Sequence, residues 1–96
     1  MDFDKLVHQP TRLQIFSHLY RNGRTSFQDL KAALDVTEGN LASHVSTMEE
    51  AGALAVKKEF VDKKPKTSYE LTEAGAELFE AHVQTLETLI DQLEDE

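Results

Sequence analysis

The segment that most constrains this chain runs from Thr37 to Gly52 and reads TEGNLASHVSTMEEAG. Its apolar residues Leu41, Val45 and Met48 recur at positions i, i+4 and i+7, which places them on one face of a helix. The other face carries short polar side chains over three turns, where an ordinary surface helix carries long charged ones. The pattern therefore predicts a helix that is buried on one side and adapted to close contact with a ligand on the other.

Short hydrogen-bonding groups near a helix N-terminus let the backbone approach a ligand closely and leave N–H groups free to meet a phosphate. This is how the second helix of a helix-turn-helix enters the major groove of DNA. We therefore interpret residues 37–51 as a recognition helix rather than an ordinary solvated surface. Its candidate DNA-binding residues are Gly39, then Asn40, Ser43, His44 and Thr47 toward base edges, and Thr37 and Ser46 toward phosphates.

Two helices are predicted before the recognition helix. Pro10 suits the first position of a helix over residues 11–21, which stops at Asn22-Gly23. Ser26 is a good N-cap for a second helix, whose apolar residues repeat at i, i+3 and i+7. The helix-turn-helix is therefore expected over residues 26–51, with a tight turn at Asp35.

A β-hairpin is predicted after the recognition helix. Leu54, Val56 and Phe60 alternate with small or charged residues, the period of a half-buried strand, and Tyr69 and Leu71 point inward on a second strand. Residues 61–66 (VDKKPK) read as a basic loop between them, and residues 57–66 have a net charge of +3. We expect this wing to meet DNA phosphates or the minor groove through Lys63, Lys64, Pro65 and Lys66. Weaker candidates for backbone contacts are Arg12, Arg24 and Lys31.

The last predicted element is a long helix, capped by Thr72 and running to about Leu93. Its apolar residues are spaced 3, 4, 3, 4, 3, which is a heptad seam. Such a helix has more apolar length than a small domain can cover, and we expect a second copy of the chain to bury it. The alternative is packing on its own domain only. The candidate dimer-interface residues are Ala76, Phe79, Val83, Leu86, Ile90 and Leu93.

Composition limits the remaining possibilities. At 96 residues the chain has room for one structural unit, with a DNA-binding part over residues 1–72 and a dimerisation helix over residues 73–96. The net charge of −8 lies entirely in residues 73–96, since residues 1–72 carry ten acidic and ten basic side chains. Such acidity is also compatible with a salt-rich cytoplasm. The acidic helix is expected to lie away from DNA.

The chain has no cysteine, and neither a membrane-spanning run nor a signal-peptide pattern, so we expect a cytoplasmic protein. No phosphate loop or catalytic acid pair is recognisable, and we expect neither an enzyme nor a cofactor. Metal binding is not expected either, because the four histidines, His8, His18, His44 and His82, lack ligand spacing.

Three blocks of sequence carry a resemblance to a known family. They are residues 10–16 (PTRLQIF), residues 39–52 and residues 64–75 (KPKTSYELTEAG). Together they resemble the winged-helix transcriptional regulators, in the neighbourhood of the MarR and ArsR families. The resemblance implies an α+β fold, mostly α, in which three helices and a β-hairpin wing form a winged helix-turn-helix that a long dimerisation helix follows.

The same resemblance implies a homodimer that reads a pseudo-palindromic operator on double-stranded DNA and represses transcription by occlusion. The chain departs from the ArsR pattern in one respect, because metal sensors of that type often use cysteines. An effector and the operator are not visible in the sequence. The net charge of −8 keeps a second hypothesis open, in which the winged helix is a protein-interaction module that does not bind DNA.

Overall fold

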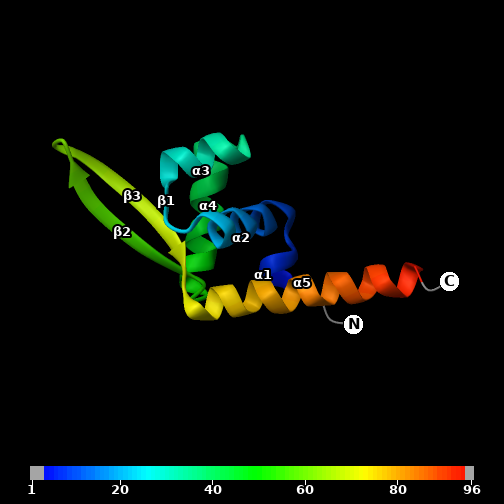
Figure 1. The fold of residues 1–96 in the computed structure, drawn as a ribbon. Helices are drawn as coiled ribbons and strands as arrows, with labels where there is room; N and C mark the ends of the chain where they lie inside the picture. The colour runs from blue at the N-terminus through cyan, green and yellow to red at the C-terminus, as the bar shows by residue number, and fades with distance from the viewer. Residues whose placement is uncertain (1–3, 95–96) are drawn as a thin grey trace.

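The computed structural model describes residues 4–94, and it confirms a winged-helix fold (Figure 1). A three-stranded antiparallel sheet extends from a group of helices, and one long helix closes the chain. The elements are α1 (Lys5–His8), α2 (Pro10–Asn22), β1 (Thr25–Ser26), α3 (Phe27–Leu34), α4 (Glu38–Glu50), β2 (Leu54–Val61), β3 (Lys64–Leu71) and α5 (Glu73–Glu94).

Local capping explains where the helices begin and end. Pro10 is the first residue of α2, and Gly23 ends that helix with a φ of 75°. The Ser26 hydroxyl caps α3 by accepting from the Asp29 N–H at 3.1 Å. Asp35 turns the chain into α4 in the left-handed conformation, with a φ of 52°. The predicted helix-turn-helix and its turn are therefore confirmed.

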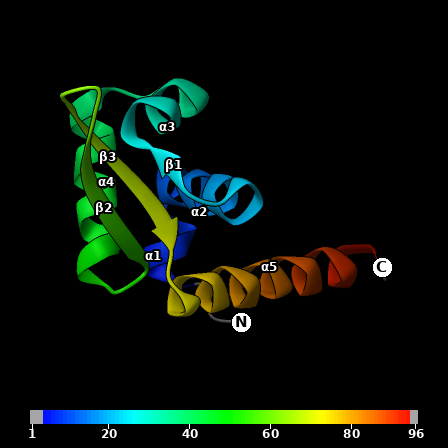
Figure 2. The ribbon, with the colours of Figure 1, turned by 60° about the vertical axis from the view of Figure 1, so that its left-hand side comes forward.

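The sheet contains a third, short strand that no pattern in the sequence predicts. Thr25 and Ser26 form β1, which pairs with Tyr69 and Ser68 of β3 in the order β1-β3-β2. This pairing attaches the base of the wing to the beginning of α3. Figure 2 shows β1 leading from α2 into α3 beside the hairpin.

The wing is longer and its turn shorter than predicted. Both strands have eight residues, and only Asp62 and Lys63 connect them, so the predicted loop over residues 61–66 was wrong. Both turn residues have positive φ, 53° and 66°, as a two-residue type I′ turn requires. Pro65 and Lys66 consequently lie within β3.

The core lies between the helices and the inner end of the sheet. Its fully buried side chains include Ile15 and Phe16 of α2, Leu30 of α3, and Leu41 and Met48 of α4. Leu54 and Tyr69 extend it onto the sheet. The prediction that Phe60 points inward was wrong, because its side chain is 78% exposed. The alternating pattern of β2 continues beyond the core. Near the turn there is no core for a side chain to pack against, so Phe60 is exposed despite its place in the pattern.

Helix α5 packs on the domain with its first half only. Phe79 is 9% exposed and lies against Phe16 and Tyr20, at ring-centroid distances of 6.2 Å and 5.1 Å. The outer residues Ile90 and Leu93 are 51% and 67% exposed. The predicted seam is therefore divided, and Phe79 corrects the expectation that a second copy covers all of it. No helix within residues 4–94 is long and apolar enough to cross a membrane.

Glycine is required where α5 begins. A Cβ built on Gly75 would lie 2.2 Å from the backbone oxygen of Ala53, in the connection between α4 and β2. That same oxygen accepts the N–H of Thr72 at 3.0 Å, and the Thr72 hydroxyl caps α5 by accepting the Gly75 N–H at 3.0 Å. The first turn of α5 is thus held directly against the end of the recognition helix.

Candidate nucleic-acid interface

Helix α4 presents the predicted polar face to solvent. Leu41, Val45 and Met48 are at most 5% exposed, so the opposite side of the helix lies outward. The exposed residues on that side include Gly39 and the short polar side chains of Asn40, Ser43, Ser46 and Thr47. Ala42 and the acidic residues Glu38, Glu49 and Glu50 at the two ends of the helix are exposed as well. A Cβ on Gly39 would meet no atom within 4 Å, so another surface can approach the backbone there.

The N-terminus of α4 is less open to a phosphate than the sequence analysis expected. The Thr37 hydroxyl caps the helix and accepts the Asn40 N–H at 3.2 Å. Glu38 is the first residue of the helix, and its exposed carboxylate complements the helix dipole at this end. A negative side chain next to the cap opposes a phosphate, so the phosphate contacts predicted for Thr37 are disfavoured by its neighbour. Because Glu38 follows Thr37 directly in the sequence, this repulsion could have been predicted without the structure.

His44 lies at the edge of the polar face rather than in its middle. Its side chain is half-buried, and its Nδ1 lies 3.3 Å from the guanidinium Nη1 of Arg12 on α2. Burial, and then the charge of Arg12, lower the pKa of His44 below its ordinary value. The imidazole is therefore held neutral near pH 7, and it keeps one donor and one acceptor.

Arg12 is occupied by contacts within the domain. Its Nε donates to the Leu6 carbonyl at 2.7 Å, and its Nη2 donates to the Lys5 carbonyl at 3.3 Å. These carbonyls belong to the short helix α1, so Arg12 joins α1, α2 and α4. The sequence predicts that Arg12 binds the DNA backbone, but in the structure its guanidinium is engaged in contacts that join three helices of its own domain.

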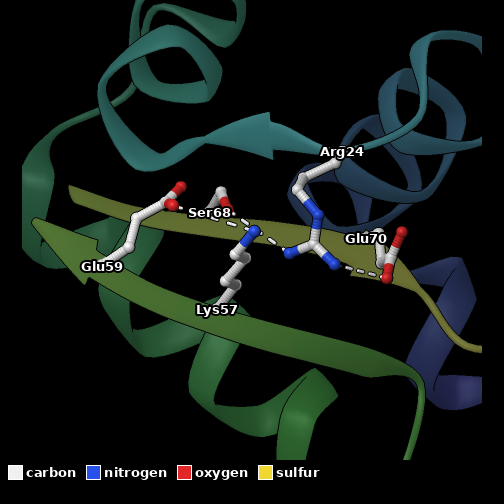
Figure 3. A network of polar contacts seen from close by, with 5 residues as sticks. All are labelled: Arg24, Lys57, Glu59, Ser68 and Glu70. Carbon is white, nitrogen blue, oxygen red and sulfur yellow. Dashed lines mark hydrogen bonds and ion pairs between the residues drawn. The ribbon is translucent and has the colours of Figure 1, made fainter. Parts of the chain in front are cut away.

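Arg24 is likewise committed to the sheet (Figure 3). Its Nη2 forms an ion pair with the Glu70 carboxylate at 2.5 Å, and its Nη1 donates to the Ser68 hydroxyl at 3.4 Å. Ser68 is only 3% exposed, so the arginine satisfies a buried hydroxyl beside the β1–β3 pairing. On the neighbouring strand, Lys57 lies 3.7 Å from Glu59. Exposed pairs such as this last one contribute little stability.

The remaining basic candidates differ in exposure. Lys63, Lys64 and Lys66 are exposed along the outer part of the wing, together with Pro65. Lys31 is half-buried in the last turn of α3. The structure thus leaves the wing lysines available to a ligand and places Arg12 and Arg24 in internal contacts.

A groove separates the wing from the helix-turn-helix. It is open to solvent and has a volume of about 620 Å³. Its lining comes from the beginning of α3, from Glu38 of α4, from Val61 of β2 and from Pro65, Lys66, Thr67 and Tyr69 of β3. The wing and the outer half of α5 extend from opposite sides of the domain (Figure 1). The acidic outer half of α5 is therefore remote from the basic wing.

A pair of histidines that no pattern in the sequence predicts joins α1 to α5. His82 is 3% exposed, and its Nε2 lies 3.3 Å from the Nδ1 of His8. Burial, and then the neighbouring His8, lower the pKa of His82, while Asp4 acts in the opposite direction. No spacing signal could reveal a pair 74 residues apart. Among the residues that the structure describes, no three potential metal ligands gather.

Known proteins share this arrangement. A family model of winged helix DNA-binding domains matches residues 11–90. An uncharacterised protein of Methanocaldococcus jannaschii is 29% identical over 90 residues, which are 94% of this chain and 98% of that protein. A transcriptional regulator homologue from Pyrococcus horikoshii OT3 is 32% identical, with a TM-score of 0.86 over 92% of this chain and 87% of that one.

A structure described as a MarR-family transcriptional regulator, from Enterococcus faecalis V583, shares the fold. Its TM-score is 0.77 at 23% identity, over 99% of this chain and 93% of that one. These findings confirm the resemblance to winged-helix regulators. Because the family model covers most of the chain, the protein belongs to the family of winged helix DNA-binding domains.

Proposed function

We propose that this protein is a homodimeric, sequence-specific DNA-binding regulator that represses transcription by occluding a pseudo-palindromic operator. The observation that carries the proposal is the pairing of two surfaces. One is the exposed, short-chained polar face of α4, and the other is the basic wing that follows it in the chain. Membership of the winged helix DNA-binding family and the Pyrococcus regulator homologue support the same reading.

In this proposal α4 lies in the major groove. The exposed amide of Asn40 pairs with an adenine edge, and the hydroxyls of Ser43 and Ser46 meet neighbouring bases or phosphates. The Thr47 hydroxyl already donates to the Ser43 carbonyl at 3.1 Å, so toward DNA it acts as an acceptor. The neutral His44 at the edge of the face adds a donor without a charge.

The wing supplies attraction that does not depend on sequence. Lys63, Lys64 and Lys66 bind phosphates beside the helix, and Pro65 stiffens the strand that carries two of them. The carboxylates of Glu38 and Glu50 at the two ends of α4 oppose phosphates that approach there. These repulsions favour a pose in which the backbone of DNA lies against the wing and not against the helix ends.

The proposed dimer uses the outer half of α5. Ile90 and Leu93 are large, apolar and exposed, and Leu86 of the same heptad seam is half-buried. Their burial by a second copy pairs two recognition helices, which then enter successive major grooves about 34 Å apart. Such a dimer covers promoter DNA, which is the basis of the proposed repression.

The test begins with selection of a duplex by the full chain from a random-sequence pool, followed by fluorescence titration at several salt concentrations. Asn40→Ala should weaken binding to the selected duplex by roughly 1–3 kcal/mol and leave binding to a random duplex unchanged. Replacing Lys63, Lys64 and Lys66 by alanine should weaken binding to both duplexes and flatten the salt dependence.

The competing function is a protein-interaction module that does not bind DNA. The net charge of −8 and the acidic ends of α4 favour it. If the wild-type protein binds neither the selected nor the random duplex at low salt, the DNA-binding proposal fails and this alternative takes its place. Equal losses by Asn40→Ala on both duplexes would instead remove Asn40 from sequence reading.

A further inference from the structure

The wing carries an aromatic ring that the fold of the domain does not use. Phe60 is 78% exposed, whereas Phe16 and Phe79 belong to the core and Phe27 packs against it. Phe60 lies four residues beyond Val56, the partly buried residue of β2 that packs against the core. With a rise of about 3.3 Å per strand residue, its ring is roughly 13 Å further out along the hairpin.

Basic side chains lie near this ring on both faces of the hairpin: Lys58 on the same face, Lys63 in the turn, and Lys57, Lys64 and Lys66 on the opposite face. Residues 57–66 contain five lysines and two acidic residues, Glu59 and Asp62. Because neighbouring strand residues point to opposite faces, the Glu59 carboxylate lies on the face opposite Phe60, and Lys58 shares the face of the ring. Phe60 pairs across the hairpin with Pro65, which enlarges the apolar patch.

An apolar patch on a hairpin of net positive charge is complementary to a polyanion that also offers apolar surface. Duplex DNA has this chemistry, because phosphates line its grooves and base stacks lie between them. Proteins that bind the minor groove insert apolar side chains between base pairs while neighbouring Lys or Arg residues hold the backbone. The minor groove is about 6 Å wide and 7.5 Å deep, so an aromatic ring at the end of a narrow hairpin fits into it.

We propose that Phe60 is a minor-groove wedge: with the wing against DNA, its ring inserts between two base pairs, partly unstacks them and bends the duplex. This inference rests on the proposed DNA-binding function and adds to it a second way of reading sequence. Pyrimidine–purine steps unstack most easily, so the wedge selects a TA or CA step in the flank of the operator. The wing then reads deformability, whereas α4 reads base edges.

The test uses the full chain and the duplex that the wild-type protein selects, with 2-aminopurine placed at successive positions of the flank. Insertion of the ring unstacks one step and brightens the probe at that position only. Phe60→Ala should abolish the brightening and weaken binding about tenfold, with the salt dependence unchanged because no charge is lost. Lys64→Ala should do the reverse, flattening the salt dependence by about 0.9 in logarithmic slope and keeping the brightening.

Val61→Ala is the matched control, because Val61 is the neighbouring exposed apolar residue of the same strand and points to the other face. It should bind within about twofold of wild type. Equal losses by Val61→Ala and Phe60→Ala would assign the effect to hairpin stability and overturn the wedge. So would a Phe60→Ala protein that binds and brightens like wild type, while the proposed DNA-binding function stands.

A measurement of self-association tests the remaining possibility, in which the Phe60 ring packs against another protein surface instead of DNA. Sedimentation of wild type and Phe60→Ala without DNA should give the same mass. A loss of self-association on substitution would place Phe60 in a protein contact and overturn the wedge. If the wild-type protein selects no duplex from the pool, the proposed function and the wedge fail together.

Discussion

Gly75→Ala should destabilise the protein, although alanine is the better helix former. In an open helix position the change gains up to about 1 kcal/mol. Here the new Cβ would lie 2.2 Å from the Ala53 oxygen, against 3.4–4 Å for ordinary van der Waals contact, so helix and backbone must separate by about 1 Å. Ala53 is fully buried and cannot move alone, because its N–H also donates to the Met48 carbonyl at 2.9 Å.

The separation breaks one of two hydrogen bonds that share Thr72. If Thr72 moves with α5, its N–H leaves the Ala53 carbonyl; if Thr72 stays with Ala53, its hydroxyl is drawn away from the Gly75 N–H that it caps. Overpacking in a tight contact costs about 1–3 kcal/mol, and the loss of either hydrogen bond costs about 1 kcal/mol. Against the gain in helix propensity, the net loss is about 2 kcal/mol. For a domain of this size that is a fall in Tm of roughly 8–16 °C.

Thermal unfolding followed by circular dichroism at 222 nm measures this loss, with all variants at one protein concentration because a dimer's Tm depends on it. Gly39→Ala is the matched control, since Gly39 is also in the first turn of a helix but has no atom within 4 Å of its built Cβ. Its Tm should equal or exceed that of wild type. A Gly75→Ala protein as stable as Gly39→Ala would refute the close packing of α5 on Ala53.

Three further predictions follow from the wing, the buried histidine and the end of α5. Lys63→Gly should raise stability by about 1 kcal/mol, because Lys63 has a φ of 66° and glycine tolerates it, while the lost charge weakens DNA binding; denaturation and titration of one sample check both. Because the pKa of His82 is lowered in the folded protein, the unfolded chain binds more protons, and the free energy of unfolding should fall as pH drops below about 6.5. His82→Asn should reduce this pH dependence, which urea titrations at pH 5.5 and 7.5 measure. Leu93→Glu should yield monomers in sedimentation while Tm measured at high dilution stays unchanged; a persistent dimer would remove the outer half of α5 from the interface.

Much of the fold was predictable because helix ends are determined by neighbours in sequence. Pro10 begins α2, and Ser26, Thr37 and Thr72 each cap a helix by accepting a backbone N–H three residues later, so these features follow directly from the local sequence. The polar face of α4 was predictable for a similar reason, because helical periodicity places residues on faces without knowledge of the rest of the fold.

The missed features depend on partners distant in the chain. Strand β1 has only two residues, and it exists because β3 lies beside it. The two-residue turn has Lys63 with a positive φ, at a position where glycine is common in such turns, so the residue type did not indicate the turn. The heptad pattern of α5 showed apolar residues in a row but not which partner covers each one, so Phe79 was assigned to a second copy although Phe16 already covers it.

For the candidate site, the sequence showed which residues have the right chemistry to bind DNA, but not which of their side chains are free of contacts within the domain. Arg12 and Arg24 have the charge that a phosphate requires, but each is held by groups that only the fold brings near: backbone carbonyls of α1 for Arg12, and Glu70 for Arg24. Within residues 4–94, Lys63, Lys64 and Lys66 form no ion pair, and the lysine of the wing that does is Lys57, in its weak pair with Glu59. Glu38 is different, since its position beside the helix cap was legible in the sequence.

The four-residue helix α1 connects the two ends of the proposed machinery. On one side its His8 touches His82 of α5, and on the other its carbonyls hold Arg12, whose guanidinium reaches His44 at the edge of the recognition face. The helix proposed to join two copies and the helix proposed to read DNA are therefore linked by three side-chain steps. A molecule that shifted α1 would act on both helices at once, without contacting either of them directly.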